Sequence, residues 1–196
     1  MRMLSQLEEE VRGCRRCPLC LTRRRAVPGE GNQNARLMFV GEAPGYYEDL
    51  EGRPFVGAAG KLLTEMIEER LEIKRQDVYI TNIVKCRPPG NRDPSPKEVE
   101  ICSPYLERQL EIVKPKIVVS LGRHSTIYLL SKAGISARGI LSVRGRTYQI
   151  RNDPTSFLLM PTIHPAAALY DPKNLKILEY DFEKLKHILK EAPPIG

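Results

Sequence analysis

The sequence predicts an α/β protein, specifically a three-layer α/β/α sandwich around a mostly parallel four-stranded sheet. Four short apolar runs, each the length of a buried strand, alternate along the chain with amphipathic helical patterns. The third run, residues 117–121, is apolar at four of its five positions, which is typical of a central strand covered on both faces. We expect the carboxyl ends of the strands to meet at one edge of the sheet, where open α/β sheets bind ligands.

Length and composition limit the kind of protein this is. The 196 residues suit a single domain with a substantial core. Lys and Arg number 31 against 24 Asp and Glu, and the resulting net charge of +7 suits a polyanionic partner. The first residues lack the apolar core of a signal peptide, and no apolar run approaches the roughly 18 residues of a membrane span. We therefore expect a cytoplasmic protein that acts as a monomer without membrane contact.

The first half of the chain begins with a short amphipathic helix, whose apolar face comprises Met3, Leu4, Leu7 and Val11. The run Arg23-Arg24-Arg25 follows and is by default a solvated surface. Residues 37–40 form the first predicted strand. After a long loop, a second helical pattern runs to about Leu71, and residues 78–84, rich in β-branched and aromatic side chains, form the second strand.

A capping box opens the next helix, because Ser95 is followed directly by Pro96 and three residues later by Glu98. The same helix carries Cys102 on its inward face. The remaining elements follow in the order strand, helix, β-hairpin, strand and helix, at residues 117–121, 123–130, 139–150, 157–160 and 174–189.

The loop after the first strand, residues 41–57, is the longest between a predicted strand and a predicted helix. It begins with Gly41-Glu42-Ala43-Pro44-Gly45 and ends with Gly52-Arg53-Pro54-Phe55-Val56-Gly57. An ordinary connection of this kind has about 2–6 residues. The glycines let the backbone approach a ligand closely. The loop is therefore predicted to form a binding site.

Two polar residues, Asn82 and His164, lie where predicted strands end, and Phe55 belongs to the long loop. A phenyl ring can stack on a flat base, and a carboxamide offers a donor beside an acceptor, as the pairing edge of uracil requires. A histidine can stabilise an oxygen on which negative charge develops. Each residue also has an ordinary explanation: a core aromatic, a satisfied buried amide and a turn cap. Their convergence at one edge favours a pocket for a base.

Five cysteines in a cytoplasmic protein indicate a metal centre more readily than disulfides. Cys14 and Cys17 are separated by two residues, and Cys86 and Cys102 lie far downstream. Cys20 makes a second C-x-x-C with Cys17, so spacing leaves the local pair open. Loop positions beside basic residues favour thiolates. Four thiolates can bind zinc or an iron–sulfur cluster, and spacing does not separate the two. The alternative is a set of small buried hydrophobic side chains.

Taken together, the motifs resemble the iron–sulfur uracil-DNA glycosylases, family 4 of the uracil-DNA glycosylase superfamily, from Cys14 to the last helix. The resemblance rests on both ends of the loop 41–57 and on Thr81-Asn82-Ile83-Val84-Lys85-Cys86-Arg87-Pro88-Pro89, Asn91-Arg92 and His164-Pro165-Ala166. It implies one [4Fe–4S] cluster rather than zinc, with Cys20 as a spare thiol. The ligands that it implies are Cys14, Cys17, Cys86 and Cys102. The chain would then be a single glycosylase domain, residues 1–196, with an N-terminal cysteine segment of about residues 1–35 tied in by the cluster.

The reaction that the resemblance implies is hydrolysis of the N-glycosidic bond of uracil in single- or double-stranded DNA. The base leaves the stack first, and an abasic site remains for base excision repair. The uracil-binding residues implied are Gly41, Glu42, Ala43, Phe55, Asn82 and His164, and the catalytic ones are Glu42, Asn82 and His164. His164 would stabilise the departing uracilate. The superfamily often has an aspartate where this chain has Ala43, so Glu42 is the nearest carboxylate that could position water.

The resemblance also implies which residues exclude thymine and which bind DNA. Glu48 is expected to exclude the methyl group of thymine, with Tyr46 as the other candidate. Residues expected to contact DNA are Lys85, Arg87, Arg92, Pro165 and Ala166, with Lys173 as a further phosphate contact and Leu169 or Tyr170 as the wedge in the stack.

Two other classes of protein compete with this interpretation. An iron–sulfur electron carrier would use the cysteines but leave Asn82, Phe55 and the long loop without a role. A nucleotide-binding module would use the pocket without catalysis. Release of free uracil from DNA distinguishes a glycosylase from both.

Overall fold

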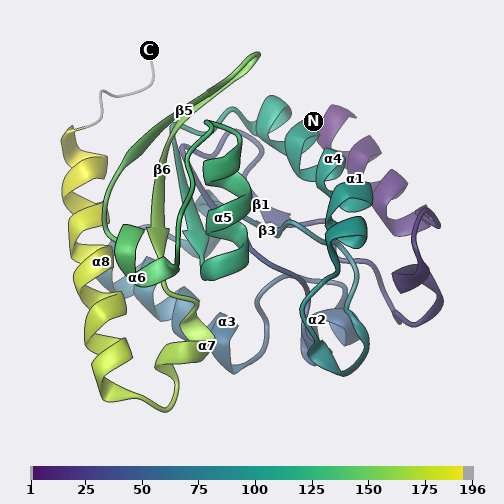
Figure 1. The fold of residues 1–196 in the computed structure, drawn as a ribbon, viewed down its shortest axis with the longest axis horizontal. Helices are drawn as coiled ribbons and strands as arrows, with labels where there is room; N and C mark the ends of the chain where they lie inside the picture. The colour runs from purple at the N-terminus through teal and green to yellow at the C-terminus, as the bar shows by residue number, and fades with distance from the viewer. Residues whose placement is uncertain (1, 192–196) are drawn as a thin grey trace.

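The computed structural model describes residues 2–191 and contains a six-stranded sheet in the order β1-β3-β2-β4-β6-β5 (Figure 1). Its four central strands are mutually parallel: β3 (Tyr79–Asn82), β2 (Leu37–Gly41), β4 (Ile117–Leu121) and β6 (Thr155–Thr162). They coincide with the four predicted strands. The α/β class is therefore confirmed, with all the predicted strands in the parallel part of the sheet.

The predicted number of strands is wrong, because a short antiparallel strand extends each edge of the sheet. At one edge β1 (Glu30–Gly31) pairs with β3, and at the other β5 (Tyr148–Asn152) pairs with β6. The hairpin expected within residues 139–150 lies further along the chain, where the turn Asp153-Pro154 joins β5 to β6. Part of the expected hairpin is instead the short helix α6 (Ile140–Val143).

Five longer helices cover the sheet: α1 (Arg2–Gly13), α3 (Ala58–Glu65), α4 (Pro96–Val113), α5 (Arg123–Ser131) and α8 (Pro172–Glu191). A π-helical turn, Met66–Arg70, extends α3. Two short helices lie in loops, α2 (Tyr46–Glu51) and α7 (Pro165–Ala168). Single 3-10 turns occupy Pro18–Leu21, Arg75–Asp77 and Pro89–Asn91.

The core consists of two apolar clusters, one on each face of the sheet. Met38 and Val40 of β2 point into the cluster that contains side chains of α1, α4 and α5. Leu37 and Phe39 of the same strand point into the other cluster, with side chains of α3 and α8. Because successive side chains of a strand point to opposite faces, a fully apolar strand requires helices on both sides. Figure 1 shows this arrangement, with the sheet between the two groups of helices.

The start of α4 confirms the predicted capping box. The Ser95 hydroxyl accepts a hydrogen bond from the backbone N–H of Glu98, and the Glu98 carboxylate accepts one from the N–H of Ser95. Among residues 2–191, no helix is long and apolar enough to span a membrane.

Candidate active site

A cavity of about 360 Å³ lies at the edge of the sheet where the parallel strands end. Along this edge Figure 1 shows α2 and α3, which follow β2, and α7, which follows β6. Most of the side chains predicted to bind uracil line this cavity: Glu42, Ala43, Phe55, Asn82 and His164, together with Glu48. The convergence expected from the sequence therefore occurs.

Gly41 provides the floor against which two of these side chains pack. It lies opposite Asn82 in the register of β2 and β3. A Cβ atom at Gly41 would lie 2.3 Å from Oδ1 of Asn82 and 2.7 Å from Cζ of Phe55. Both distances are well below van der Waals contact. The position therefore requires glycine so that the carboxamide and the phenyl ring can occupy the same corner.

Asn82 is buried, with only 2% of its surface exposed. Its Oδ1 has no hydrogen-bond partner among the described residues. A buried acceptor left unpaired costs about 1–3 kcal/mol. A ligand that donates an N–H to this oxygen would recover that free energy, so the site favours a ligand with such a donor.

Glu48 holds together the two ends of the loop 41–57. Its carboxylate accepts hydrogen bonds from the backbone N–H groups of Gly45 at 3.1 Å and of Val56 and Gly57 at 2.9 Å each. Phe55, next to this clamp, has a φ of 52°, which is uncommon for a residue with a side chain. Glu48 thus fixes the backbone that aims the Phe55 ring into the cavity. Its role in excluding thymine stays a prediction.

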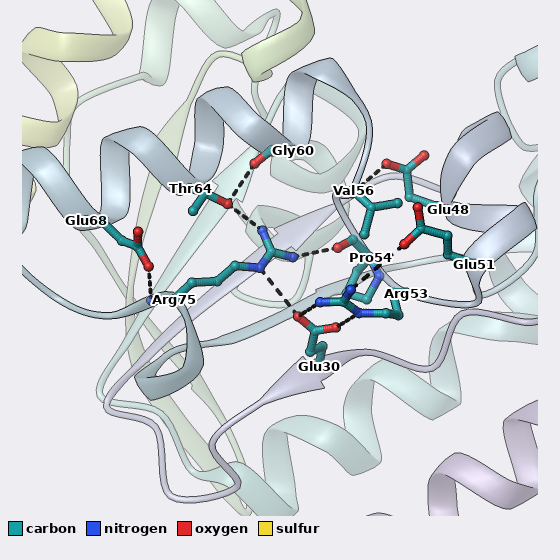
Figure 2. Close-up of polar contacts among 10 residues, drawn as sticks. All are labelled: Glu30, Glu48, Glu51, Arg53, Pro54, Val56, Gly60, Thr64, Glu68 and Arg75. Carbon is teal, nitrogen blue, oxygen red and sulfur yellow. Dashed lines mark hydrogen bonds and ion pairs between the residues drawn. The ribbon is translucent and has the colours of Figure 1, made fainter.

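Arg75 supports the same loop from outside (Figure 2). Its guanidinium donates hydrogen bonds to the carbonyl of Pro54 at 2.7 Å and to Oγ1 of Thr64 at 2.8 Å. Glu30 bridges it to Arg53, with Oε2 of Glu30 2.6 Å from Nε of Arg53. No local sequence pattern pointed to Arg75, because its partners lie in separate segments of the chain.

His164 lies in the cavity as a neutral hydrogen-bond donor. Its ring stacks on that of Phe55, with 5.6 Å between the centroids and 28° between the planes. Nδ1 accepts a hydrogen bond from the backbone N–H of Ala166, so the neutral ring carries its proton on Nε2. Burial lowers the pKa of His164 to about 4, against a smaller opposing effect of Glu48. At neutral pH this residue therefore caps α7 with one nitrogen and offers an uncharged N–H with the other.

Glu42 belongs to a group of three titratable side chains that bring a ligand atom each within 4.8 Å of one another, the others being Asp93 and His124. Oε2 of Glu42 lies 2.8 Å from Nδ1 of His124, and Nε2 of that ring lies 3.4 Å from Oδ2 of Asp93. The other carboxylate oxygen, Oε1, is buried without a hydrogen-bond partner in the described chain. His124 was not predicted as a site residue, although its position just after β4 places it at the same edge.

The four predicted ligand cysteines, Cys14, Cys17, Cys86 and Cys102, line a small cavity between α1, α4 and the segment after β3. Cys20 also reaches this cavity. Burial raises the pKa of the Cys86 thiol to about 11 and that of Cys102 in the same direction, so their thiolates need positive neighbours. Arg23 supplies one, at 2.8 Å from Sγ of Cys86.

Four cysteine sulfur atoms around one cavity form a donor set that could hold a metal centre. Such a set suits a zinc ion or an iron–sulfur cluster.

The structure contradicts the prediction that Lys85 contacts a DNA phosphate. Lys85 is 1% exposed, and its ammonium donates hydrogen bonds to Oγ1 of Thr81 at 2.7 Å, the carbonyl of Asn82 at 2.5 Å and Oε1 of Gln109 at 2.6 Å. Its backbone N–H donates to Sγ of Cys102 at 3.2 Å. The sequence suggested a surface lysine because its neighbour Arg87 is also basic, but the segment turns inward at Lys85. The residue connects the cysteines to the strand that carries Asn82.

The two arginines predicted to contact DNA, Arg87 and Arg92, lie near the cavity. Arg92 lines it and forms an ion pair of 2.7 Å with Glu98. Arg87 lies over the ring of Tyr46, 5.1 Å from its centroid, and donates a hydrogen bond to Asn91. Tyr46 is itself partly exposed at the surface. Arg87 and Arg92 are thus placed beside the opening, and their contact with DNA stays a prediction.

The segment after His164, in which the sequence suggested a loop, forms the short helix α7. Pro165 is buried, whereas Ala166 is exposed and lines the cavity. Tyr170 is 91% exposed and Leu169 partly exposed, so Tyr170 is the more accessible of the two candidate wedges. Lys173 is also exposed.

Residues 28–189 match the sequence model of the Uracil DNA glycosylase superfamily. The matched segment contains the entire sheet and every residue that lines the cavity at the edge of the sheet. The fold, the cavity and this match together place the chain in the uracil-DNA glycosylase superfamily.

Relatives that match nearly the whole chain show to which type within the superfamily it belongs. A Type-4 uracil-DNA glycosylase from Sulfurisphaera tokodaii is 55% identical over 188 residues, which cover 96% of this chain and 86% of the relative. Those of Archaeoglobus fulgidus and Thermotoga maritima are 44% and 42% identical, over 99% and 96% of this chain and 97% and 96% of the relatives. The chain belongs to the type-4 uracil-DNA glycosylases.

Proposed function

We propose that this protein removes uracil from DNA by hydrolysing its N-glycosidic bond, which begins base excision repair. The observation that carries the proposal is the buried Asn82 carboxamide with an unpartnered oxygen, in one cavity with Phe55 and a neutral His164. Membership of the type-4 glycosylases supports this activity over an electron carrier or a non-catalytic nucleotide-binding module.

Recognition of uracil follows from the groups around the cavity. The base stacks on Phe55, and its N3–H and O4 meet the oxygen and the NH₂ group of the Asn82 carboxamide. Backbone groups of Gly41, Glu42 and Ala43 contact the remaining edge. Glu48, which lines the cavity and holds the loop closed, restricts the space beside C5 and so disfavours thymine.

His164 stabilises the leaving group. When the bond between C1′ and N1 breaks, the electron pair stays with uracil, and negative charge develops on the base and its O2. A neutral Nε2–H donates a hydrogen bond to that oxygen without giving up its proton, which is the role of an oxyanion stabiliser. The low pKa of His164 keeps the ring in this form at neutral pH.

Glu42 positions the attacking water. Oε1, which has no partner among the described residues, can accept a hydrogen bond from a water that adds to C1′, while His124 holds Oε2. Ala43 supplies no carboxylate of its own. We assign Glu42 to orientation of water, and most of the rate to stabilisation of the leaving anion.

DNA lies across the opening of the cavity, in single- or double-stranded form. Arg87 and Arg92 contact phosphates, the backbone of Pro165 and Ala166 approaches the minor groove, and Tyr170 fills the gap left by the flipped base. Uracil is less firmly stacked in a mismatch or a single strand, so those substrates cost less to open.

A [4Fe–4S] cluster held by Cys14, Cys17, Cys86 and Cys102 would complete the protein. It supplies a structural cross-link, since glycosidic hydrolysis moves no electrons. The position of the four cysteines around one cavity and membership of the type-4 family support this cluster. It would join the N-terminal segment, about residues 1–35, to the rest of a single domain, residues 1–196, that acts as a monomer.

The proposal is tested by incubating the purified protein with uracil-containing oligonucleotides and measuring free uracil and abasic sites. Cytosine- and thymine-containing strands serve as controls. Release of free uracil from uracil strands alone is expected. A protein that binds these strands without releasing uracil would contradict the proposal.

A further inference from the structure

A second cavity, of about 720 Å³, lies beside the N-terminal cysteine segment and is lined largely by arginines. We refer to it as the arginine cavity. Its guanidinium groups belong to Arg12, Arg15, Arg23, Arg24, Arg25 and Arg53. The lining contains a single carboxylate, that of Glu51. A hollow with this excess of positive charge favours an anionic ligand.

Several of these charges are already neutralised inside the protein. Arg12 forms an ion pair with Glu9, 2.5 Å between Nη1 and Oε1. Arg53 forms one with Glu30, as Figure 2 shows. Arg23 donates hydrogen bonds to Sγ of Cys86 and to backbone carbonyls. These three guanidinium groups are therefore committed to the structure.

The other three, Arg15, Arg24 and Arg25, are exposed and have no side-chain ion pair within the described chain. The backbone that carries two of them is held firmly. Buried Asp49 accepts hydrogen bonds from the N–H groups of Arg24 at 2.9 Å and Arg25 at 3.4 Å. The side chain of Arg25 crosses Gly52, where an added Cβ would lie 3.3 Å from its Cδ. Three uncompensated arginines thus line one hollow, and the backbone of two of them is held by Asp49.

The arginine cavity and the cavity at the edge of the sheet, here called the uracil cavity, lie at opposite ends of α2. Gly45 and Glu48, at the start of α2, line the uracil cavity, whereas Glu51, Gly52 and Arg53, at its end, line the arginine cavity. A helix of six residues is about 9 Å long. Phosphates of one DNA strand repeat about every 3.4 Å along the helix axis. The two cavities thus lie about one short helix apart, so that one DNA strand could reach both.

We propose that the arginine cavity binds backbone phosphates of the same DNA strand, a few nucleotides from the flipped uracil. Guanidinium groups suit this ligand because their forked N–H donors bind phosphate oxygens in pairs. Arg24 and Arg25, in a run that is by default a solvated surface, become part of the DNA-binding face. This inference rests on the proposed uracil-DNA glycosylase function, and it adds a site remote from the reacting base.

The test compares the triple variant Arg15→Gln, Arg24→Gln, Arg25→Gln with a charge-matched control, Arg138→Gln, Arg146→Gln, Arg151→Gln. The control arginines are also exposed and lie near α6 and β5, at the opposite edge of the sheet. Single-stranded substrates carry one uracil, and the flank on either side is lengthened one nucleotide at a time. The kcat/KM for uracil release is measured for each, with binding of a uracil-free 20-nucleotide strand as a function of salt.

For the wild type and the control, kcat/KM should rise once one flank is long enough to reach the arginine cavity, and the rise should be absent in the triple variant. On the shortest substrate all three proteins should be equally active. The slope of log K against log salt should be smaller by about 2 in the triple variant, since each single-strand contact contributes about 0.7.

Two outcomes would overturn the inference: an unchanged flank dependence and salt slope in the triple variant, or an equal loss on every substrate including the shortest. Failure of the proposed function looks different, because the wild type would then release no uracil from any strand. The salt slope on uracil-free DNA would still report whether the arginine cavity binds phosphates.

Discussion

Glu42 and His124 are joined by a hydrogen bond of 2.8 Å, although 82 positions separate them in the sequence. The bond uses one carboxylate oxygen of Glu42 and leaves the other, Oε1, buried and without a partner among the described residues. His124 comes from the first turn of α5 and is approached on its other side by Asp93. The carboxylate that we assign to the attacking water is thus held by a residue that does not line the cavity.

Replacing His124 with Ala should lower kcat for uracil release by about tenfold to a hundredfold and leave KM nearly unchanged. A hydrogen bond to a charged group contributes about 1.5–3 kcal/mol, and its loss would let the Glu42 carboxylate rotate. Single-turnover rates would measure the effect. In a Glu42→Gln background the same change should add little, because the carboxylate is already gone. Equal losses in both backgrounds would show that His124 acts independently of Glu42.

Changes at Asn82 should separate recognition from folding. Asn82→Ala removes both hydrogen-bonding groups, and we expect uracil excision to fall roughly a hundredfold or more. Asn82→Asp presents oxygen where O4 of uracil needs a donor, so uracil excision should fall as steeply. That variant offers an acceptor to the N4 amino group of cytosine, and slow cytosine excision is its expected gain. Near-normal uracil release by an iron-loaded Asn82→Ala protein would show that Asn82 is not needed to recognise uracil.

Gly41→Ala should impair the pocket while leaving every functional side chain in the sequence. The new Cβ would clash with Oδ1 of Asn82 at 2.3 Å and with the Phe55 ring at 2.7 Å, so both must move. We expect weaker uracil binding and slower excision, measured by product inhibition with free uracil and by kcat/KM. Gly139→Ala is the matched control, since no atom lies within 4 Å of its added Cβ. Equal activities of the two variants would contradict this account.

The cysteines can be distinguished by iron content and stability. Cys86→Ala or Cys102→Ala should lower both the bound iron and the melting temperature, because each is a buried cysteine that we assign to the cluster and that would join separate segments. Cys20→Ser should change neither, although Cys20 lines the same cavity. Iron analysis, visible absorption and thermal unfolding of each variant provide the measurements. Loss of iron in Cys20→Ser would reassign the ligand set.

The low pKa of His164 predicts how activity and stability depend on pH. The neutral form persists down to about pH 4, so this residue should cause no loss of kcat/KM near pH 6.5, where an ordinary histidine titrates. Between those values the unfolded chain binds a proton that folded His164 does not, so its contribution makes the free energy of unfolding decrease as pH falls. The pH profiles of the wild type and His164→Gln provide the comparison. An acid limb near pH 6.5 that disappears in His164→Gln would show that the ring is not held neutral.

Local sequence patterns were enough to predict the four parallel strands, the capping box of α4 and the segments that meet at the active edge. Each of these is encoded locally: a strand by an apolar run, a helix start by Ser95 and Glu98, a site by a long loop after a strand. Asn82 and His164 could be predicted because they lie at or just after the ends of strands, and these ends must meet in a parallel sheet.

The edge strands and the surroundings of individual side chains could not be predicted from local patterns, because both depend on the folded chain. A strand as short as β1 has no periodicity to detect, and it forms because β3 offers an unpaired edge. The burial of Lys85, the contact between Glu42 and His124, and the hollow lined by Arg15, Arg24 and Arg25 depend on segments far apart in the chain. Sequence patterns describe a residue's neighbours along the chain, whereas its charge state and partners depend on the neighbours that folding brings around it.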